Sequence, residues 1–284
     1  MKGMEDLPPL REVIAKHGLS ARRRLGQNFL FDVNLTDKIV RKSGTIVGHD
    51  ILEIGPGPGG LTRSLISAGA RRVVAIEKDR RFLPALHEIE DAASGILSVI
   101  HADAMDIDPS SIVSPPAKII SNLPYNAATT LLAGWLSVAN WPPPWISLVL
   151  AFQREVAERL IAGPGTKSYG RMSILSQWRT SASIVMTIPP SAFVPVPKVT
   201  TAIVRFDALP APIHDAEPHL MLLVAKTAFS QRRKMLRTSL KPLGGNIESM
   251  LAAAGISPEA RADALSISDY CAIARELGKV DLPD

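Results

Sequence analysis

Cysteine and long apolar runs are nearly absent from this chain. Cys271 is the only cysteine among 284 residues, which excludes an internal disulfide framework and a zinc site built on cysteines. We expect Cys271 to be buried filler in an apolar helical pattern. No apolar run approaches the ~18 residues of a membrane span, and Met1–Pro9 lacks the apolar core of a signal peptide. We therefore expect a cytoplasmic monomer with no membrane partner and no metal.

Apolar residues and positive charge are what the chain has in quantity. Hydrophobic residues make up 46% of it, enough for a sizeable core, and the length suggests one large domain and one small one. The formal net charge is +5 and the pI is near 9.4, which suits a polyanionic partner. Many enzymes with no nucleic-acid role are equally basic, so charge alone leaves the function open.

From Asp50 to about Phe206, short β-rich runs alternate with helical patterns, which is typical of a doubly wound α/β sheet. The last two runs have no helix between them, only a proline-rich stretch, and such a pair is normally antiparallel. We therefore predict a Rossmann-like core with a seven-stranded, mostly parallel sheet, as in S-adenosylmethionine (SAM) dependent methyltransferases. The predicted strands are Ile51–Ile54, Arg72–Ile76, Ile96–Ile100, Lys118–Ser121, Ile146–Ala151, Ser183–Ile188 and Thr200–Phe206.

A linker follows this core at Pro210-Ala211-Pro212, and the pattern beyond it is purely helical. We predict an α/β domain over residues 1–208, of which 1–45 form a helical, basic extension with a short helix at Pro8–His17. Residues 209–284 are predicted to form a small helical domain.

A glycine loop joins the first predicted strand to a helix within Ile51–Gly60. Glycines allow close backbone approach to a ligand, and the helix N-terminus adds free N–H donors. Gly55, Gly57 and Gly60 also satisfy the Gly-x-Gly-x-x-Gly spacing of dinucleotide sites, so the loop alone does not separate NAD from SAM. Two prolines in the loop favour SAM, because proline cannot donate an N–H to a pyrophosphate.

Two acids follow the next strands. Glu77 ends the second strand, about 22 residues after Gly55, where a carboxylate can accept both ribose hydroxyls of an adenosine cofactor. Asp103 follows the third strand, where it can accept from an adenine amine. Because strand ends of one parallel sheet meet at one crevice, we expect these acids beside the glycine loop.

Asn122-Leu123-Pro124-Tyr125 stands after the fourth strand. An aromatic amine is a poor nucleophile because its lone pair is delocalised, so methyl transfer requires the nitrogen to pyramidalise. The Asn122 side-chain oxygen and the carbonyl of Leu123 or Pro124 can accept its two hydrogens in that geometry. Tyr125 offers a face on which an extruded base can stack.

Three further features suit an RNA substrate. Phe193, in a proline-rich rim, is a second candidate stacking face, and Lys198 beside it can meet phosphate. Arg22, Arg23 and Arg24 form one basic candidate, with plain solvation as the alternative. A second candidate is a predicted helix with Ala225, Phe229, Leu236 and Leu240 on one face, away from which lie Arg233, Lys234, Arg237 and Lys241.

Together these motifs resemble the ribosomal RNA small-subunit methyltransferase A family, the bacterial dimethyladenosine transferases. The resemblance spans roughly Gly18 to Lys241. The segments that carry it are Leu25–Leu30, Glu53–Gly59, Asn122–Asn126, Phe193–Val199 and Ala228–Lys234. The related resistance methyltransferases of large-subunit RNA share the Asn-x-Pro-Tyr core, but the last of these segments looks like the small-subunit type.

The resemblance implies N6,N6-dimethylation of two adjacent adenosines near the 3′ end of 16S ribosomal RNA, in an assembling small subunit. It also implies that Asn28 and Leu30 contact SAM, together with Gly55, Glu77, Asp103 and Asn122. Residues 1–208 would then be the methyltransferase domain, and the small helical domain over residues 209–284 would contact RNA or the ribosome. Two alternatives stay open. One is an NAD-dependent dehydrogenase, which rests on the glycine loop, and the other is a non-catalytic ribosome-assembly or RNA-binding module.

Overall fold

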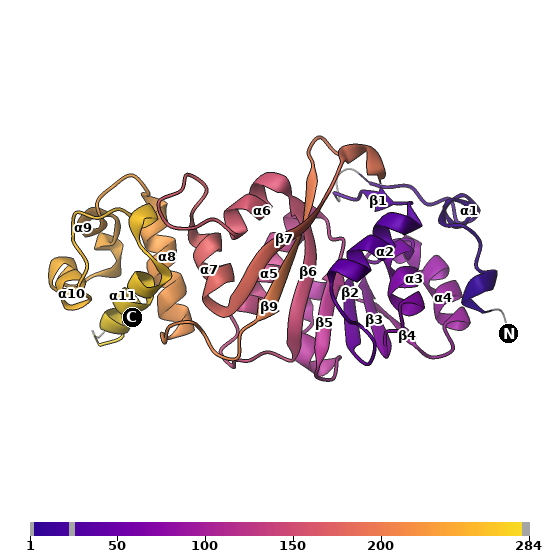
Figure 1. Cartoon of the computed structure of the whole chain (residues 1–284), viewed down its shortest axis with the longest axis horizontal. Helices are drawn as coiled ribbons and strands as arrows, with labels where there is room; N and C mark the ends of the chain where they lie inside the picture. The colour runs from indigo at the N-terminus through magenta and orange to yellow at the C-terminus, as the bar shows by residue number, and fades with distance from the viewer. Residues whose placement is uncertain (1–2, 23–25, 280–284) are drawn as a thin grey trace. The chain divides into compact units, whose positions relative to one another are not determined.

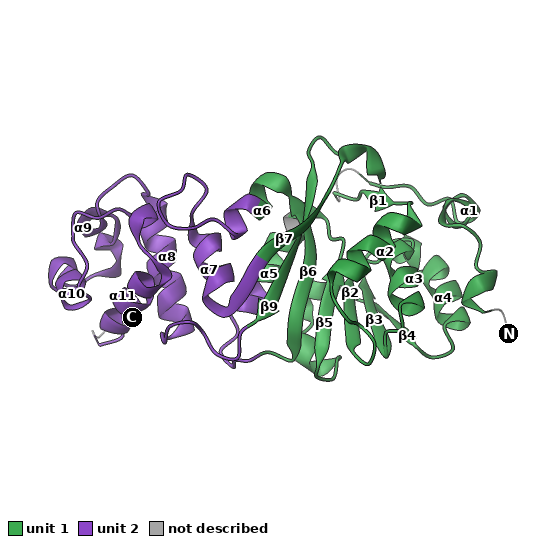
Figure 2. Cartoon of the chain, viewed as in Figure 1, with its two compact units in different colours: residues 1–132, 143–157, 183–208 green, residues 133–142, 158–182, 209–284 purple. Residues whose placement is uncertain are grey.

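The chain divides into two interleaved compact units (Figure 2). The computed structural model describes residues 3–22 and 26–279. Unit 1 consists of Met1–Leu132, Pro143–Ala157 and Ser183–Ala208, and unit 2 of Ala133–Pro142, Glu158–Ala182 and Leu209–Asp284. We expected a single boundary after residue 208. The chain passes between the two units at that point, and it also does so at the ends of two earlier segments that belong to unit 2.

Unit 1 is built on a seven-stranded sheet with the order β4-β3-β2-β5-β6-β9-β7 (Figure 1). The pairs β2–β3, β3–β4, β2–β5 and β5–β6 are parallel, whereas β6–β9 is antiparallel. This arrangement confirms the predicted Rossmann-like core. Its strands are β2 (Asp50–Ile54), β3 (Arg72–Glu77), β4 (Leu97–His101), β5 (Ala117–Ser121), β6 (Trp145–Gln153), β7 (Thr180–Ile188) and β9 (Thr201–Ala208).

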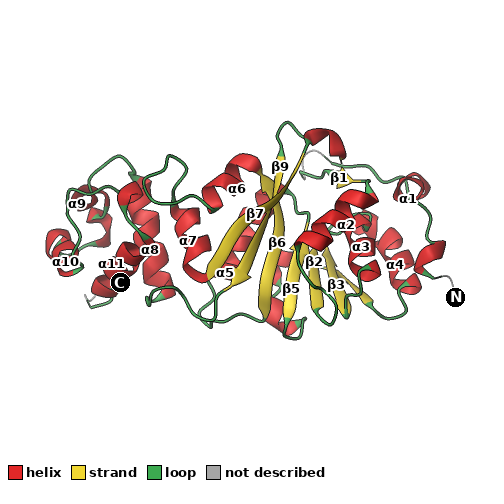
Figure 3. Ribbon diagram, in the orientation of Figure 1, coloured by secondary structure: helices red, strands yellow, loops and turns green. Residues whose placement is uncertain are grey.

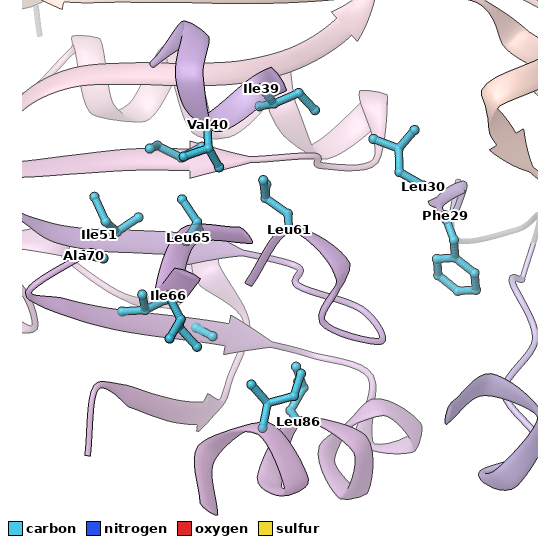
Figure 4. Packing of buried hydrophobic residues seen from close by; sticks show 14 of the residues in the cluster. Phe29, Leu30, Ile39, Val40, Ile51, Leu61, Leu65, Ile66, Ala70 and Leu86 are labelled. Carbon is cyan, nitrogen blue, oxygen red and sulfur yellow. The ribbon is translucent and has the colours of Figure 1, made fainter. Parts of the chain in front are cut away.

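Helices cover the sheet (Figure 3). Ile51 of β2 is fully buried, and side chains of α2 and α3, among them Ile39 and Leu65, lie over it (Figure 4). A strand buried on both faces is mostly apolar, and Ile51, Leu52 and Ile54 of β2 fit this pattern. The helices of this part of the chain are α2 (Val33–Lys42), α3 (Gly60–Ser67), α4 (Leu83–Ala92), α5 (Tyr125–Leu136) and α6 (Arg154–Leu160).

A two-stranded sheet joins distant segments of unit 1. In it β1 (Phe29–Leu30) pairs antiparallel with β8 (Phe193–Val194), with Leu30 opposite Phe193. The sequence did not predict this pairing, because strands this short carry no periodic signal. The predicted N-terminal helix is confirmed as α1 (Leu10–Lys16).

Unit 2 is helical around its own core. Its helices are α7 (Arg171–Arg179), α8 (Pro218–Ser230), α9 (Leu236–Ser239), α10 (Ile247–Ala253) and α11 (Ile267–Leu277). Cys271 is buried in α11, as its apolar surroundings predicted. Among the described residues, no helix combines the length and apolarity needed to cross a bilayer.

One helical prediction in unit 2 is wrong. The basic segment was expected on a single helix with Phe229 and Leu236 on the same face, but α8 ends at Ser230 and α9 begins at Leu236. A turn separates them, in which the Lys234 N–H donates to the Gln231 carbonyl at 2.8 Å. Leu236 is nevertheless fully buried, because the turn returns the chain to the same core.

Arg179 holds the segment Ala133–Pro142 within unit 2. Only 2% of its surface is exposed, and Nη1 donates to the carbonyls of Leu136 at 3.1 Å and Val138 at 2.5 Å. Its guanidinium also lies over the rings of Trp178 and Trp141, at 4.4 and 4.9 Å from the centroids. Burial lowers the pKa of Arg179, but a guanidinium stays charged at any ordinary pH.

Replacing Arg179 with Ala should therefore destabilise the protein. The change removes a buried side chain and leaves two carbonyls unpaired, which together cost about 2–4 kcal/mol of unfolding free energy. Urea denaturation followed by tryptophan fluorescence measures the loss. Arg171→Ala, at an exposed position of the same helix, is the matched control and should change stability by no more than about 0.5 kcal/mol. Equal effects of the two changes would contradict a role for Arg179 as a clamp.

Candidate functional site

Two adjoining hollows lie in unit 1 where its parallel strands end. They share Gln27, Gly55, Glu77, Leu123 and Pro124, so they form one cleft with two parts. The first hollow is lined further by Asn28, Phe29, Leu30, Glu53, Gly57, Asn122, Tyr125 and Phe193, among others. The second is lined further by Arg22, Ile54, Ile76, Lys78, Asp103 and Met105, among others. Candidates from six segments of the sequence thus converge here.

The glycine loop reaches the cleft in a conformation that favours glycine. Gly55, Gly57 and Gly59 have φ values of 63°, 55° and 88°. At Gly59 a Cβ atom would lie 2.2 Å from Cδ1 of Ile89, so both the backbone conformation and the packing against α4 exclude a side chain. The turn delivers the chain into α3, whose N-terminal N–H groups face the loop.

Glu77 ties the glycine loop to β3. Its Oε2 accepts from the Gly57 N–H at 3.0 Å and its Oε1 from the Asp79 N–H at 2.7 Å. Burial raises the pKa of Glu77, and the two N–H donors oppose that rise. A carboxylate oxygen has more than one acceptor site, so Glu77 can still accept from hydroxyl groups of a ligand.

Asp103 is already engaged in the second hollow. Its carboxylate accepts from the Met105 N–H at 3.1 Å and forms an ion pair with Lys78. The hydrogen bond from Lys78 is the main cause of the lowered pKa of Asp103. The side chain is therefore an anion on the wall that also contains Ile54 and Ile76.

Glu53 is a residue of the first hollow to which we assigned no role from the sequence. Only 1% of its surface is exposed, and Oε2 accepts from Oγ1 of the fully buried Thr62 at 2.6 Å. Burial, with a contribution from the charge of Glu77, raises the pKa of Glu53 to about 8. The signal in the sequence was an acid inside an otherwise apolar strand.

The end of β5 and the residues after it contain acceptors that are engaged and acceptors that are not. Ser121 accepts from the Ile54 N–H at 2.7 Å, which fixes the ends of β2 and β5 against each other. The Pro124 carbonyl accepts from the N–H groups of Ala127 and Ala128 at 2.9 and 3.1 Å, so it serves the first turn of α5. Among the described residues, neither the Asn122 side chain nor the Leu123 carbonyl has a hydrogen-bond partner.

Two aromatic rings line the same hollow. Phe193 is 1% exposed and held by the pairing of β8 with β1, and Tyr125 is half-buried in the first turn of α5. The Tyr125 hydroxyl is 2.6 Å from Oγ1 of Thr201. Burial raises the pKa of Tyr125, so the phenol is neutral near neutrality.

The predicted basic residues belong to both units. Arg22 lines the second hollow of unit 1 and, like Lys198, is exposed, whereas Arg23 and Arg24 lie outside the described residues. In unit 2 the side chains of Arg233, Lys234, Arg237 and Lys241 are all exposed, and that of Arg237 lies 3.8 Å from Glu259.

The neighbouring Arg232 has a different environment. It forms an ion pair with Asp263 at 3.2 Å and donates to the carbonyls of Lys167 and Thr166 at 2.6 and 3.0 Å. Arg232 therefore stabilises unit 2 itself, which leaves Arg233 and its exposed neighbours as the cations available to a polyanion.

Comparisons with known proteins agree on one family. The model of the family described as ribosomal RNA adenine dimethylase matches residues 18–279. A protein of Paracoccus denitrificans named ribosomal RNA small subunit methyltransferase A is 57% identical over 277 residues, which cover 98% of each chain.

Two solved structures show the same fold. A dimethyladenosine transferase from Plasmodium falciparum matches with a TM-score of 0.74 at 23% identity, over 88% of this chain and 98% of the other. The 23S rRNA methyltransferase ErmE matches with a TM-score of 0.66 at 22% identity, over 88% and 100%. At these identities the likeness bears on the fold alone.

The environment of Glu53 predicts a pH dependence of stability. In the folded state its proton is retained up to about pH 8, whereas in the unfolded chain it leaves near pH ~4.3. Between these values the folded state binds more protons, so this group's contribution to stability is lost as pH rises. Glu53→Gln keeps a neutral acceptor for Thr62, so wild type should lose stability relative to the variant from pH ~5 to ~8. Unfolding curves across this range measure the difference, and parallel pH profiles would contradict the prediction.

Proposed function

The chain belongs to the ribosomal RNA adenine dimethylase family, and on that premise we propose that it transfers methyl groups from SAM to the N6 amine of adenosine in small-subunit RNA. One observation carries the proposal. The hollow that contains the glycine loop, Tyr125 and Phe193 is also lined by Asn122 and Leu123, whose side-chain amide and backbone carbonyl have no hydrogen-bond partner among the described residues.

The donors and acceptors of the cleft fit SAM. Ribose hydroxyls and an adenine amine are hydrogen-bond donors, and Glu77 and Asp103 offer carboxylate oxygens in the second hollow. The loop prolines, Pro56 and Pro58, cannot supply the N–H groups that a pyrophosphate needs. Asn28 and Leu30 line the first hollow, where the family resemblance assigns them to SAM. When bound, SAM supplies an electrophilic methyl group on a sulfonium.

The acceptors favour the bent amine of the transition state. The two N–H bonds of adenine N6 donate to Asn122 and to Leu123, which leaves the nitrogen lone pair free to turn out of the ring plane. Of the two carbonyls considered from the sequence, we assign this role to Leu123, because helix α5 already uses that of Pro124. Acceptors that fit the bent geometry better than the planar one lower the barrier. The proton leaves to water once the nitrogen is cationic, so no general base is required before transfer.

The substrate follows from the relatives and from charge. A protein named ribosomal RNA small subunit methyltransferase A is 57% identical to this chain. We assign this chain two adjacent adenosines near the 3′ end of 16S RNA in an assembling subunit as its substrate. Tyr125 and Phe193 then stack on the extruded base. The exposed cations of unit 2, with Arg22 and Lys198, meet RNA phosphates. We further propose that the protein acts in the cytoplasm as a monomer.

The two alternatives are weaker. The strands of a dinucleotide-binding dehydrogenase, numbered along the chain, have the order 3-2-1-4-5-6 in the sheet. In this sheet the last strand along the chain, β9, is antiparallel to β6 and lies between β6 and β7. A non-catalytic assembly module needs no pair of acceptors beside Tyr125. An assembly role in addition to methyl transfer is compatible with every observation above.

Removal of the Asn122 amide tests the proposal directly. Small subunits that lack the modification are incubated with methyl-labelled SAM, and the labelled nucleotide is mapped. Wild type should label N6 of adenosines near the 3′ end of 16S RNA, and Asn122→Ala should slow transfer by about 10²–10³-fold while still binding SAM. Asn140→Ala, at an exposed asparagine of unit 2, should match wild type. Undiminished transfer by Asn122→Ala would refute the mechanism, and absence of labelled adenine with wild type would refute the function.

The cations of unit 2 predict a salt-dependent contribution to RNA binding. Arg233→Gln with Arg237→Gln should weaken binding and reduce the slope of log affinity against log salt by about 2, one for each phosphate contact. Filter binding at several salt concentrations measures the slope. Arg41→Gln with Lys42→Gln removes two exposed cations at the end of α2, where the strands begin, and is the matched control. An unchanged slope for the first pair would assign Arg233 and Arg237 to plain solvation.

A further inference from the structure

Thr201 forms a hydrogen bond with the phenol oxygen of Tyr125. It is the first residue of β9, it is fully buried, and its Oγ1 lies 2.6 Å from the Tyr125 hydroxyl. In the register of the sheet Thr201 lies opposite Gln153, the last residue of β6. Because β9 runs antiparallel to β6, it begins at the edge where the parallel strands end. That topology places a hydroxyl from late in the chain beside the segment after β5.

A ring in the first turn of a helix can rotate about two side-chain bonds. The backbone of α5 therefore fixes where Tyr125 begins and leaves the direction of its side chain undetermined. A hydrogen bond at the phenol oxygen, the atom farthest from the backbone, restrains rotation about the Cα–Cβ bond and so fixes where the ring lies. Stacking requires the ring at a fixed place beside the base, so the anchor bears directly on the function of the ring.

The same segment controls the other aromatic face. Phe193 is fixed by the pairing of β8 with β1, and Thr201 follows it after a short proline-rich connection. The positions of both rings thus depend on the same stretch of chain, from Phe193 to Thr201. Phe193 is held by the backbone of β8, and Tyr125 is held by the Thr201 hydroxyl. A shift of this stretch would move the two faces together.

We propose that Thr201 is a positioning residue for methyl transfer, which holds the Tyr125 ring in its place beside the target base. The inference rests on the proposed function, because it assumes that Tyr125 stacks on that base. Thr201 does not line either hollow, so it acts through Tyr125 and not through contact with substrate or cofactor.

The test separates the hydroxyl from the bulk of the side chain. Thr201→Val keeps the shape and loses the hydroxyl, Thr201→Ser keeps the hydroxyl, and Tyr125→Phe removes the other partner. Thr200→Val, at the preceding residue, is the matched control. Single-turnover transfer to unmodified small subunits is measured at saturating SAM and subunits, with the SAM dissociation constant by calorimetry and the melting temperature of each variant.

Loss of one neutral hydrogen bond corresponds to about a three- to tenfold effect. Thr201→Val and Tyr125→Phe should each slow transfer by that factor, with SAM affinity within about twofold of wild type. Thr201→Ser and Thr200→Val should match wild type. The double variant Thr201→Val with Tyr125→Phe should be no slower than either single one, because the two changes remove the same interaction.

Three results would overturn the inference. They are a wild-type rate for Thr201→Val, a loss of melting temperature without a change of rate, and fully additive effects in the double variant. Failure of the proposed function looks different, since wild type itself would then transfer no methyl group to adenine.

Discussion

The hydrogen bond from the Gly57 N–H to Glu77 is the interaction on which the cleft depends. It joins the loop after β2 to the end of β3 at a distance of 3.0 Å. The acceptor is the Glu77 carboxylate, whose pKa is raised by burial and lowered by the hydrogen bonds from backbone N–H groups. Hydrogen bonds from backbone N–H groups favour the charged form of such a buried acid. The loop can hold its left-handed turns because glycines occupy them, and α3 then begins at the cleft. The cofactor side of the site is thus a consequence of two neighbouring strands and one shared acid.

The substrate side follows from where a helix begins. Pro124 precedes the first turn of α5, so its carbonyl accepts from that turn and is unavailable for other donors. One residue earlier the chain has left β5 and has not yet entered the helix, and no described residue donates to the Leu123 carbonyl. Asn122 and Leu123 owe their free acceptors to this short gap between two regular elements. Loops between rigid elements are where reactive groups are commonly placed, for the same reason.

Three arginines of unit 2 have different environments, and they differ in how deeply they are buried. Arg179 is buried between two tryptophans and bonded to carbonyls, and it holds an early segment to the helical core. Arg232 is half-buried and paired with Asp263, whereas the adjacent Arg233 is exposed. A count of positive charge treats these three alike. Only the exposed ones can exchange their hydration for an RNA phosphate.

The sequence by itself determined the α/β core, the glycine loop and the acids and acceptors at the strand ends, because these depend on local periodicity and on motifs of a few residues. It missed the β1–β8 pair, the break between α8 and α9, and the roles of Glu53 and Thr201. Each of these depends on contacts between residues far apart in the chain: Leu30 with Phe193, Leu236 with the core of unit 2, and Tyr125 with Thr201. Such contacts have no local pattern, so only the tertiary structure decided which buried groups meet and which acceptors remain free.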